Sequence, residues 1–314
     1  DRIVLVLPLN HVHGIVNVTL CPLAVGACCE APGSFDAPAL WERFASGDVT
    51  VFMAVPTVYA RLVSAWEAAP DETRLRWSAG AAGLRLMVCG SAALPVSTLE
   101  RWQELTGHVL LERYGMSELG MALSNTLTKR VPGHVGEPFP GVEVRVVGDG
   151  GEDVAEGQPG ELLVRGPQVF AEYWRRPEAT AEAFVDGWFR TGDVAVHGPD
   201  GYRLLGRSSV DIIKTGGEKV SALEIEEVLR THPAIVDCAV VGLEDPEWGQ
   251  RVAAAVVLRP DAGADVEPEA LRAWGKQQLA PAKVPSRFVF VPELPRNTLG
   301  KVVKARVSAL FSTA

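Results

Sequence analysis

Short runs of β-branched residues alternate with amphipathic stretches in the first third of the chain, and this alternation constrains the fold more than any other feature. The strand-like runs fall at residues 2–7, 49–54 and 84–89. Helical patterns follow them near residues 16–25, 57–68 and 97–106. Such alternation is typical of parallel βαβ units with helices on both faces of a sheet. We therefore predict an α/β fold for this part of the chain.

The pattern changes twice further along. Strands separated by turns rich in Gly, Asp and Pro indicate an antiparallel β subdomain, at residues 141–147, 160–165 and 202–205. Beyond Arg207 come helical patterns at residues 222–231 and 268–279 and strand patterns at residues 236–242, 251–258 and 286–291. This is an α+β unit of ordinary domain size. We predict a large lobe over residues 1–206, a hinge over 207–211 and a small mobile lobe over 212–314, with a single continuous domain as the alternative.

Composition limits the partners and the compartment. The net charge of −9 disfavours nucleic acid and acidic membrane surfaces, because both attract a basic face. The five cysteines include no C-x-x-C pair, so we predict neither a disulfide framework nor a zinc cluster. We expect a reducing compartment, the cytoplasm or, in a eukaryote, the mitochondrial matrix. No apolar run reaches the ~20 residues of a membrane span. The oligomeric state stays open.

Two segments follow predicted strands, at the edge where open parallel sheets bind ligands. The first contains His11-Val12-His13-Gly14, and a histidine in such a place is as often structural as functional. The second, Gly90-Ser91-Ala92, has small residues that let the backbone approach a flat ligand closely. A plain strand-to-helix turn explains the second segment equally well.

The segment Arg113-Tyr114-Gly115-Met116-Ser117-Glu118 is more specific. An aromatic ring such as Tyr114 can cover a purine face. The Ser117 hydroxyl can bond a phosphate oxygen, and the Glu118 carboxylate can bind Mg²⁺ together with phosphate oxygens. The alternative is a buried tyrosine beside a surface glutamate.

A third group of segments lies around the predicted hinge. Thr191-Gly192-Asp193 is followed by Gly206-Arg207 and then by Lys214-Thr215-Gly216-Gly217. A carboxylate in a tight turn, an arginine and a double glycine suit a bound nucleotide and a passage for a second substrate. The triplet Thr-Gly-Asp alone is common in turns, so it gains weight only from its neighbours.

A last segment near the C-terminus reads Leu294-Pro295-Arg296-Asn297-Thr298-Leu299-Gly300-Lys301. Together with it, the segments above resemble the motifs of the adenylate-forming acyl-CoA synthetases over almost all of the chain. The segment from Tyr114 is similar to the family's Y-G-x-[ST]-E motif, and the segment ending at Lys301 to its P-R-x-x-x-G-K motif. The resemblance implies the C-terminal part of a large AMP-binding lobe followed by a small mobile lobe. It also implies a set of residues that bind ATP or AMP: Gly90, Ser91, Ala92, Tyr114 at adenine, Gly115, Ser117 at phosphate, Asp193 at the ribose hydroxyls and Arg207.

The resemblance further implies a first half-reaction in which a carboxylate attacks the α-phosphate of ATP. Two anions must then approach each other, so a mobile ammonium that neutralises both is the expected catalyst. Lys301 is that catalytic residue in our interpretation. Glu118 is the metal ligand for Mg²⁺, and His13 approaches the acyl substrate and the phosphate.

A second half-reaction is implied in which the coenzyme A thiol attacks the acyl-adenylate. The small lobe turns about the hinge and brings a channel for the pantetheine arm to the site, lined by Lys214, Gly216 and Gly217. Ser209 and Asp211 are both candidates for the pivot, and the sequence does not choose between them.

Within the family, the chain is most similar to the malonyl-CoA synthetases, the mitochondrial type in particular, at residues 52–57, 111–116 and 209–217. Malonate keeps one unreacted carboxylate, which must be paired when it is buried. Arg113 can clamp that group with two parallel hydrogen bonds, and His13 is the second residue expected at the acyl substrate. A structural salt bridge is the equal alternative for Arg113. The alternatives are a synthetase for methylmalonate or a medium-chain fatty acid, and a truncated nucleotide-binding protein without catalytic activity.

One family feature is missing from this sequence. The phosphate-binding loop of the family normally lies upstream of the histidine segment, and nothing similar occurs between Asp1 and Pro8. Without the backbone N–H groups of that loop, the β- and γ-phosphates lose part of their binding site. We therefore expect further residues upstream, and poor adenylation by these 314 residues alone.

Overall fold

The structure is a computed structural model that describes residues 1–260, 262, 266–297 and 300–312. The chain divides into two compact units. The first unit comprises Asp1–Gln158, Leu162–Thr191 and His197–Arg203. The second unit comprises Pro159–Glu161, Gly192–Val196 and Leu204–Ala314.

A seven-stranded sheet organises the first unit, with strand order β2-β1-β3-β4-β5-β6-β7. Its first five strands are parallel: β1 (Arg2–Val4), β2 (Cys28–Glu30), β3 (Val51–Ala54), β4 (Leu86–Gly90) and β5 (Leu111–Met116). This confirms the predicted parallel α/β layer. The sheet then continues antiparallel through β6 (Gly120–Ser124) and β7 (Glu137–Pro138), a change of direction that periodicity alone did not indicate.

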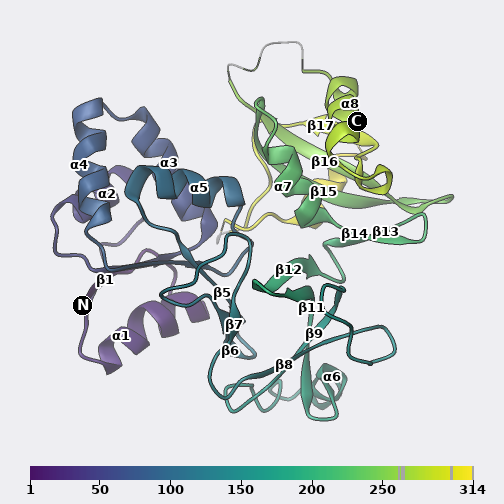
Figure 1. Ribbon diagram of the computed structural model, residues 1–314, viewed down its shortest axis with the longest axis horizontal. Coiled ribbons are helices and arrows are strands. Elements are labelled where there is room, and N and C mark those ends of the chain that lie inside the picture. Colours follow the sequence, from purple (N-terminus) through teal and green to yellow (C-terminus); the bar gives the residue numbers. More distant parts are fainter. Residues whose placement is uncertain (261, 263–265, 298–299, 313–314) are drawn as a thin grey trace. The chain divides into compact units, whose positions relative to one another are not determined.

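Helices lie on both sides of this sheet (Figure 1). One side carries α2 (Ala37–Ala45), α3 (Pro56–Ala68), α4 (Asp71–Ala82) and α5 (Val96–Thr106). The other side carries the π-helix η1 (His13–Leu20) and the short α1 (Cys21–Ala24). The core beneath the four helices is aromatic, because Trp41 stacks on Trp77 at 5.7 Å and on Trp102 at 5.2 Å.

The predicted β subdomain is present as a second sheet. Its strands are β8 (Glu143–Val147), β9 (Gly160–Arg165), β10 (Phe184–Val185), β11 (Trp188–Gly198) and β12 (Gly201–Arg207), and the short α6 (Pro177–Ala183) precedes β10. The order is β10-β11-β9-β8, with β12 paired to β11. Residues of β9, β11 and β12 are divided between the two units.

The second unit is built on a third sheet of order β14-β13-β16-β15, with β17 also paired to β16. The strands are β13 (Ile212–Thr215), β14 (Glu218–Ser221), β15 (Ile235–Asp245), β16 (Gly249–Leu258) and β17 (Arg287–Phe290). The helices are α7 (Ala222–Arg230), α8 (Pro268–Gln278), the 3₁₀ turn η2 (Pro281–Lys283) and α9 (Lys304–Ala309). The predicted α+β architecture is therefore confirmed.

Both faces of this third sheet are buried because side chains alternate along each strand. Cys238 and Val240 pack with Ile225 of α7 and Leu271 of α8. The intervening residues Ala239 and Val241 pack with Val307 of α9. The long hairpin of β15 and β16 thus contributes to two separate cores.

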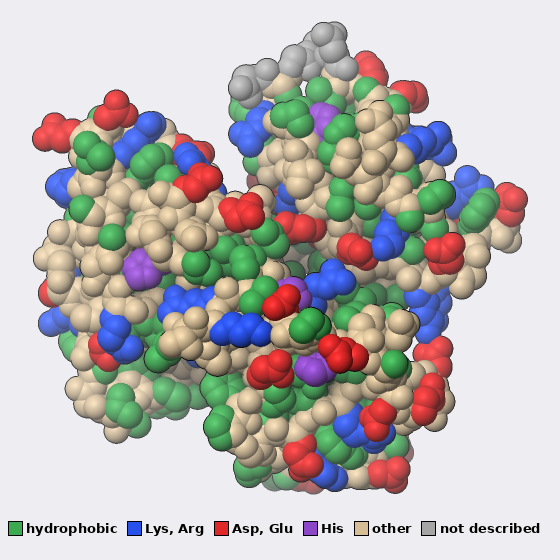
Figure 2. Space-filling view, viewed as in Figure 1, with side chains coloured by type: hydrophobic (Ala, Val, Ile, Leu, Met, Phe, Trp, Pro, Cys, Tyr) green, Lys and Arg blue, Asp and Glu red, His purple; other side chains and the backbone are tan. Residues whose placement is uncertain are grey.

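Charged side chains of both signs share the visible surface. Figure 2 shows Lys and Arg side chains interspersed with Asp and Glu over that face. Among the described residues, no helix is both long and apolar enough to cross a membrane.

Candidate active site

The structure brings together two residues predicted to belong to the site, His13 and Ser91. His13 begins η1 and is only 6% exposed, and its Nδ1 lies 3.0 Å from the Ser91 hydroxyl. Ser91 follows β4 with φ of 71°, a left-handed conformation that costs energy for a residue with a side chain. Such strain persists only where the surroundings impose it, which marks this end of β4 as a constrained position.

Close backbone packing explains the glycines beside it. Gly90 pairs in register with Arg113 of β5, and a Cβ at Gly90 would lie 3.1 Å from the Arg113 carbonyl oxygen. A Cβ at Gly115 would lie 2.0 Å from the Gly120 carbonyl oxygen, which no side chain can tolerate. The sheet itself therefore requires glycine at position 115 and leaves little room for a side chain at position 90, whatever ligand the sheet edge binds.

The predicted nucleotide-binding residues on β5 and after β4 and β5 differ in their exposure to solvent. Tyr114 is 8% exposed, whereas Ser117 lies exposed in the turn before β6 and Ala92 is exposed after β4. Glu118 accepts a hydrogen bond from the Tyr173 hydroxyl at 3.1 Å. The Tyr173 ring packs against Phe170 at a tilt of 55°, with ring centroids 4.6 Å apart, and the Phe170 N–H donates to the Glu118 carbonyl at 2.8 Å.

Glu118 fits the predicted role of metal ligand in its chemistry. Among the described residues no group of three or more His, Cys, Asp or Glu side chains could hold a metal ion. Mg²⁺ in nucleotide enzymes is commonly bound by one or two carboxylates together with substrate phosphates and water. A single carboxylate, oriented by Tyr173, satisfies that requirement.

Arg113 stands beside a cavity of about 360 Å³. Its Nη2 donates to the Met53 sulfur at 3.2 Å, and no carboxylate of the described residues forms an ion pair with it. Other residues that line the cavity are mostly apolar, among them Leu86, Val88 and Leu111. The exposed Glu137 also lines it and lies 3.7 Å from His197 instead of pairing with Arg113. Desolvation lowers the pKa of Arg113 to about 10, so the side chain remains cationic at neutral pH. A charged guanidinium without an internal counterion suits an anionic ligand.

In the second unit the structure brings Asp193, Arg207 and Lys301 together. Arg207 Nε lies 3.4 Å from Asp193 Oδ1, and Asp193 is 7% exposed on β11. Desolvation and the positive charge of Arg207 lower the pKa of Lys301, and the Asp193 carboxylate opposes this effect. Three residues far apart in sequence therefore share one electrostatic environment.

Lys301 lies on a turn that is closed by two hydrogen bonds between its backbone and Asn297. Its N–H donates to Asn297 Oδ1 at 3.0 Å, and its carbonyl accepts from the Asn297 N–H at 2.9 Å. Arg296 and Val302 pair across the turn. Thr298 and Leu299 of the predicted motif lie outside the described residues.

The two pivot candidates differ in their contacts. Asp211 Oδ2 accepts from the Arg207 N–H at 3.0 Å, and its Oδ1 lies 3.7 Å from the Lys304 ammonium. Ser209 lies exposed in the intervening turn. The linker is therefore tied down at Asp211 and accessible at Ser209.

The predicted channel residues occupy the turn between β13 and β14. Gly216 and Gly217 have φ of 57° and 84°, which favours glycine at both positions. The Gly216 N–H donates to the Trp248 carbonyl at 3.0 Å, and a Cβ at Gly216 would lie 2.9 Å from the Trp248 ring. Lys214 is exposed and pairs across the hairpin with Lys219.

Sequence reasoning missed three side chains in these surroundings: Tyr173, Met53 and Trp248. Each contacts a predicted residue; Tyr173 and Trp248 come from segments without a motif, whereas Met53 lies in the segment 52–57 that carried the resemblance but was given no role. Sequence spacing gives no signal for them, since 55 residues separate Tyr173 from Glu118 and 60 separate Met53 from Arg113.

Comparisons with known proteins identify the family to which the sequence is similar. The family described as AMP-binding enzyme matches residues 1–174, and that described as AMP-binding enzyme C-terminal domain matches residues 224–301. The mitochondrial malonate–CoA ligase of Mus musculus is 51% identical, over 97% of this chain and 56% of its own length. The malonate–CoA ligase of Arabidopsis thaliana is 42% identical, over 97% and 53%.

A solved structure gives the same result. ATP-bound MatB from Rhodopseudomonas palustris superposes with a TM-score of 0.89 at 37% identity, over 99% of this chain and 60% of that one. The chain spans about half the length of the curated relatives it matches.

Proposed function

The chain belongs to the family of AMP-binding enzymes, and from this premise we infer that the protein is a malonyl-CoA synthetase. The reaction joins malonate to coenzyme A through malonyl-adenylate and releases AMP and pyrophosphate. Relatives named malonate–CoA ligase, at 42% to 51% identity, support the substrate. We also propose a reducing compartment, the cytoplasm or the mitochondrial matrix, and the mitochondrial name of the Mus musculus relative supports the latter.

Arg113 is the observation that carries the choice of malonate. A dicarboxylate that reacts at one end leaves the other end ionised in the acyl pocket. Arg113 is cationic, forms no ion pair with a carboxylate of the described residues and lines a cavity, so it can supply the charge that a second carboxylate needs. His13, held by Ser91, supplies a further polar group for the acyl substrate.

In the first half-reaction a malonate oxygen attacks the α-phosphorus of ATP, a P–O bond forms and the bond to pyrophosphate breaks. Lys301 neutralises the negative charge that gathers during this step. Its lowered pKa and its proximity to Arg207 and Asp193 support this role. Asp193 accepts hydrogen bonds from the ribose hydroxyls, and Arg207 contacts the same nucleotide.

The remaining nucleotide contacts come from the first unit. Gly90, Ser91 and Ala92 border the adenosine, Tyr114 and Gly115 lie at the adenine, and Ser117 binds a phosphate oxygen. Glu118 would hold Mg²⁺, which shields phosphate charge when it is bound.

In the second half-reaction the thiol sulfur of coenzyme A attacks the acyl carbonyl, and AMP leaves. We assign residues 1–206 to a large lobe and 212–314 to a small lobe that turns about the linker 207–211. This rotation of the small lobe makes Lys214, Gly216 and Gly217 the lining of the pantetheine channel. Either Ser209 or Asp211 is the pivot, and the accessibility of Ser209 favours the former.

The test is pyrophosphate release by the protein expressed from its complete reading frame. Malonate, methylmalonate, acetate and octanoate are supplied in parallel, each with and without coenzyme A. Release favouring malonate, with formation of malonyl-CoA, is the expected result. Release with octanoate instead would retain the mechanism and reject the dicarboxylate pocket, and no release with any acid would favour a nucleotide-binding protein without catalysis.

A further inference from the structure

Arg296 connects the turn that carries Lys301 to the body of the second unit. Its Nη1 donates to the Gly300 carbonyl at 2.5 Å, directly before Lys301 in the chain. Its Nη2 forms an ion pair with Asp237 on β15. The two ends of one planar guanidinium therefore fix the backbone beside Lys301 to a strand of the sheet.

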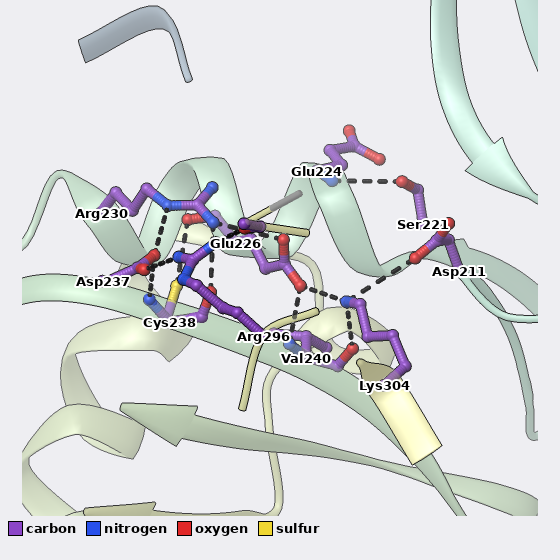
Figure 3. Close-up of polar contacts among 11 residues, drawn as sticks. Asp211, Ser221, Glu224, Glu226, Arg230, Asp237, Cys238, Val240, Arg296 and Lys304 are labelled. Carbon is purple, nitrogen blue, oxygen red and sulfur yellow. Dashed lines mark hydrogen bonds and ion pairs between the residues drawn. The ribbon is translucent and has the colours of Figure 1, made fainter. Parts of the chain in front are cut away.

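Asp237 is itself held in place. Its Oδ1 accepts from the Cys238 N–H at 2.8 Å and lies 3.4 Å from Nε of Arg230 on α7. Arg230 also donates to the Cys238 carbonyl at 3.1 Å and pairs with Glu226 one helical turn earlier at 3.4 Å. The carboxylate that anchors Arg296 is thus oriented by both a strand and a helix (Figure 3).

The contacts continue to the linker. Glu226 accepts from the Val240 N–H at 2.8 Å and forms an ion pair with Lys304, the first residue of α9. Lys304 also donates to the Val240 carbonyl at 2.7 Å and lies 3.7 Å from Asp211. Figure 3 shows this series of contacts from Asp211 to Arg296.

The series is balanced in charge, and its exposure falls from the pair of Arg296 and Asp237, whose side chains are 33% and 25% exposed, toward Glu226 and Lys304. Three cations, Arg230, Arg296 and Lys304, face three anions, Asp211, Glu226 and Asp237. The Glu226 and Lys304 side chains are 6% and 12% exposed. Buried ion pairs of this kind add little net stability compared with apolar residues, and where they have a role it lies in fixing one arrangement.

We propose that Arg296 is a positioning residue for Lys301, and that the buried ion series from Asp237 to Asp211 braces it. The proposal rests on the proposed function, since it takes Lys301 as the cation of the adenylation step. Arg296 acts through the Gly300 carbonyl and through the turn, and it touches no substrate.

A purely structural role would be met by any cation opposite Asp237. The observed contacts require more, because they use two nitrogens of one rigid guanidinium, Nη1 for the Gly300 carbonyl and Nη2 for Asp237. A lysine at this position has all its donors on one nitrogen of a flexible stem, so it does not hold the two partners in the same directions. Arg296→Lys therefore separates the two roles: it keeps the ion pair with Asp237 and gives up the bond to Gly300.

The first experiment measures the two half-reactions of the whole protein separately, by ATP–pyrophosphate exchange and by thioester formation from preformed malonyl-adenylate. Arg296→Ala should slow exchange by about 10²-fold, the usual loss when a catalytic group is displaced by about 1 Å, and leave thioester formation within twofold. Arg296→Lys should keep the midpoint of thermal unfolding and still slow exchange.

The matched control is Arg287→Ala. Arg287 belongs to the same unit and donates to the Phe311 carbonyl, so its loss should change neither rate.

The second experiment needs no activity. The pH dependence of Lys301 acetylation by acetic anhydride is followed by mass spectrometry of the folded chain. Arg296→Ala and Asp237→Asn should both shift the Lys301 profile to higher pH. In both variants the turn that carries Lys301 loses its anchor, so Lys301 leaves the surroundings that lower its pKa. Arg287→Ala should leave the profile in place.

An unchanged profile in a folded Arg296→Ala variant would overturn the proposal, and so would full recovery of exchange by Arg296→Lys. Failure of the proposed function gives another pattern, in which Lys301→Ala leaves exchange intact while the labelling shift still occurs. The two failures are therefore distinguishable.

Discussion

The two units hold their predicted site residues by different physical means. In the first unit, close backbone packing and local strain fix the site, as at Ser91 and Gly115, and Arg113 is left without an internal carboxylate. In the second unit, turns carry the site and ion pairs brace them, as at Arg207 with Asp193 and Arg296 with Asp237. Under the proposed function, the unit that receives the charged substrate keeps an arginine without an ion pair, whereas the unit that carries Lys301 pairs its charged side chains with one another.

The largest effect should come from the second unit. Lys301→Ala removes the cation assigned to the adenylation step, so ATP–pyrophosphate exchange should fall by about 10³-fold, in the range lost with one preorganised electrostatic group. Thioester formation from supplied malonyl-adenylate should persist. Lys276→Ala, at an exposed position of α8, is the control and should leave both rates unchanged. Equal loss of both half-reactions would show that the contrast between the units is wrong.

The next effect tests the uncompensated charge of the first unit. Arg113→Met should lower kcat/KM for malonate by about 10²-fold, as expected when a buried charge loses its partner, with a smaller loss for acetate. Parallel steady-state assays with the two acids provide the measurement. Equal losses for both acids would point to a structural role for Arg113.

Packing strain should affect stability more than catalysis. Gly115→Ala places a methyl group 2.0 Å from the Gly120 carbonyl oxygen, so the free energy of unfolding should fall by about 3 kcal/mol. Chemical denaturation gives this quantity. Gly198→Ala is the matched control, since a Cβ there meets nothing within 4 Å. A Gly115→Ala variant as stable as the control would mean that the sheet adjusts freely at this point.

The smallest effect concerns an ion pair of the first unit outside its site. Hydrogen bonds from Arg76 and Trp77 lower the pKa of Glu42 from 4.5 to about 2. Glu42 therefore contributes stability above pH 4.5, and that contribution is lost as pH falls toward 2. Glu42→Gln should flatten the pH dependence of unfolding in this window, by less than about 1 kcal/mol because the pair is exposed. Glu100→Gln, on the exposed side of α5, should not change it.

Much of the fold could be predicted from local pattern. The alternation that predicted strands near β1, β3 and β4 reflects their burial, and the apolar runs of β15 and β16 reflect a sheet covered on both faces. Helix α4 went unpredicted because only Trp77 and Ala81 of its residues are buried, so it shows little periodicity. Helix α2 carried a usable signal, since Asp36 caps it by accepting from the Ala39 N–H at 2.8 Å.

The site could be predicted only as separate pieces. Motif resemblance identified His13 and Ser91, but 78 residues separate them, and their contact is a property of the folded sheet. The same holds for Arg296 and Asp237, 59 residues apart. Spacing within a motif reports on one turn or one strand, whereas these contacts depend on which strands become neighbours.

The division of the predicted residues between two units has a consequence for how such proteins diversify. Arg113 belongs to the first unit, and Lys301 with its bracing ion series belongs to the second. Under the proposed roles, a genetic crossover near Thr191 leaves acid recognition with one parent and keeps Asp193, Arg207 and the turn of Lys301 together in the other. Selection for a new acid then acts mainly on the upstream coding segment.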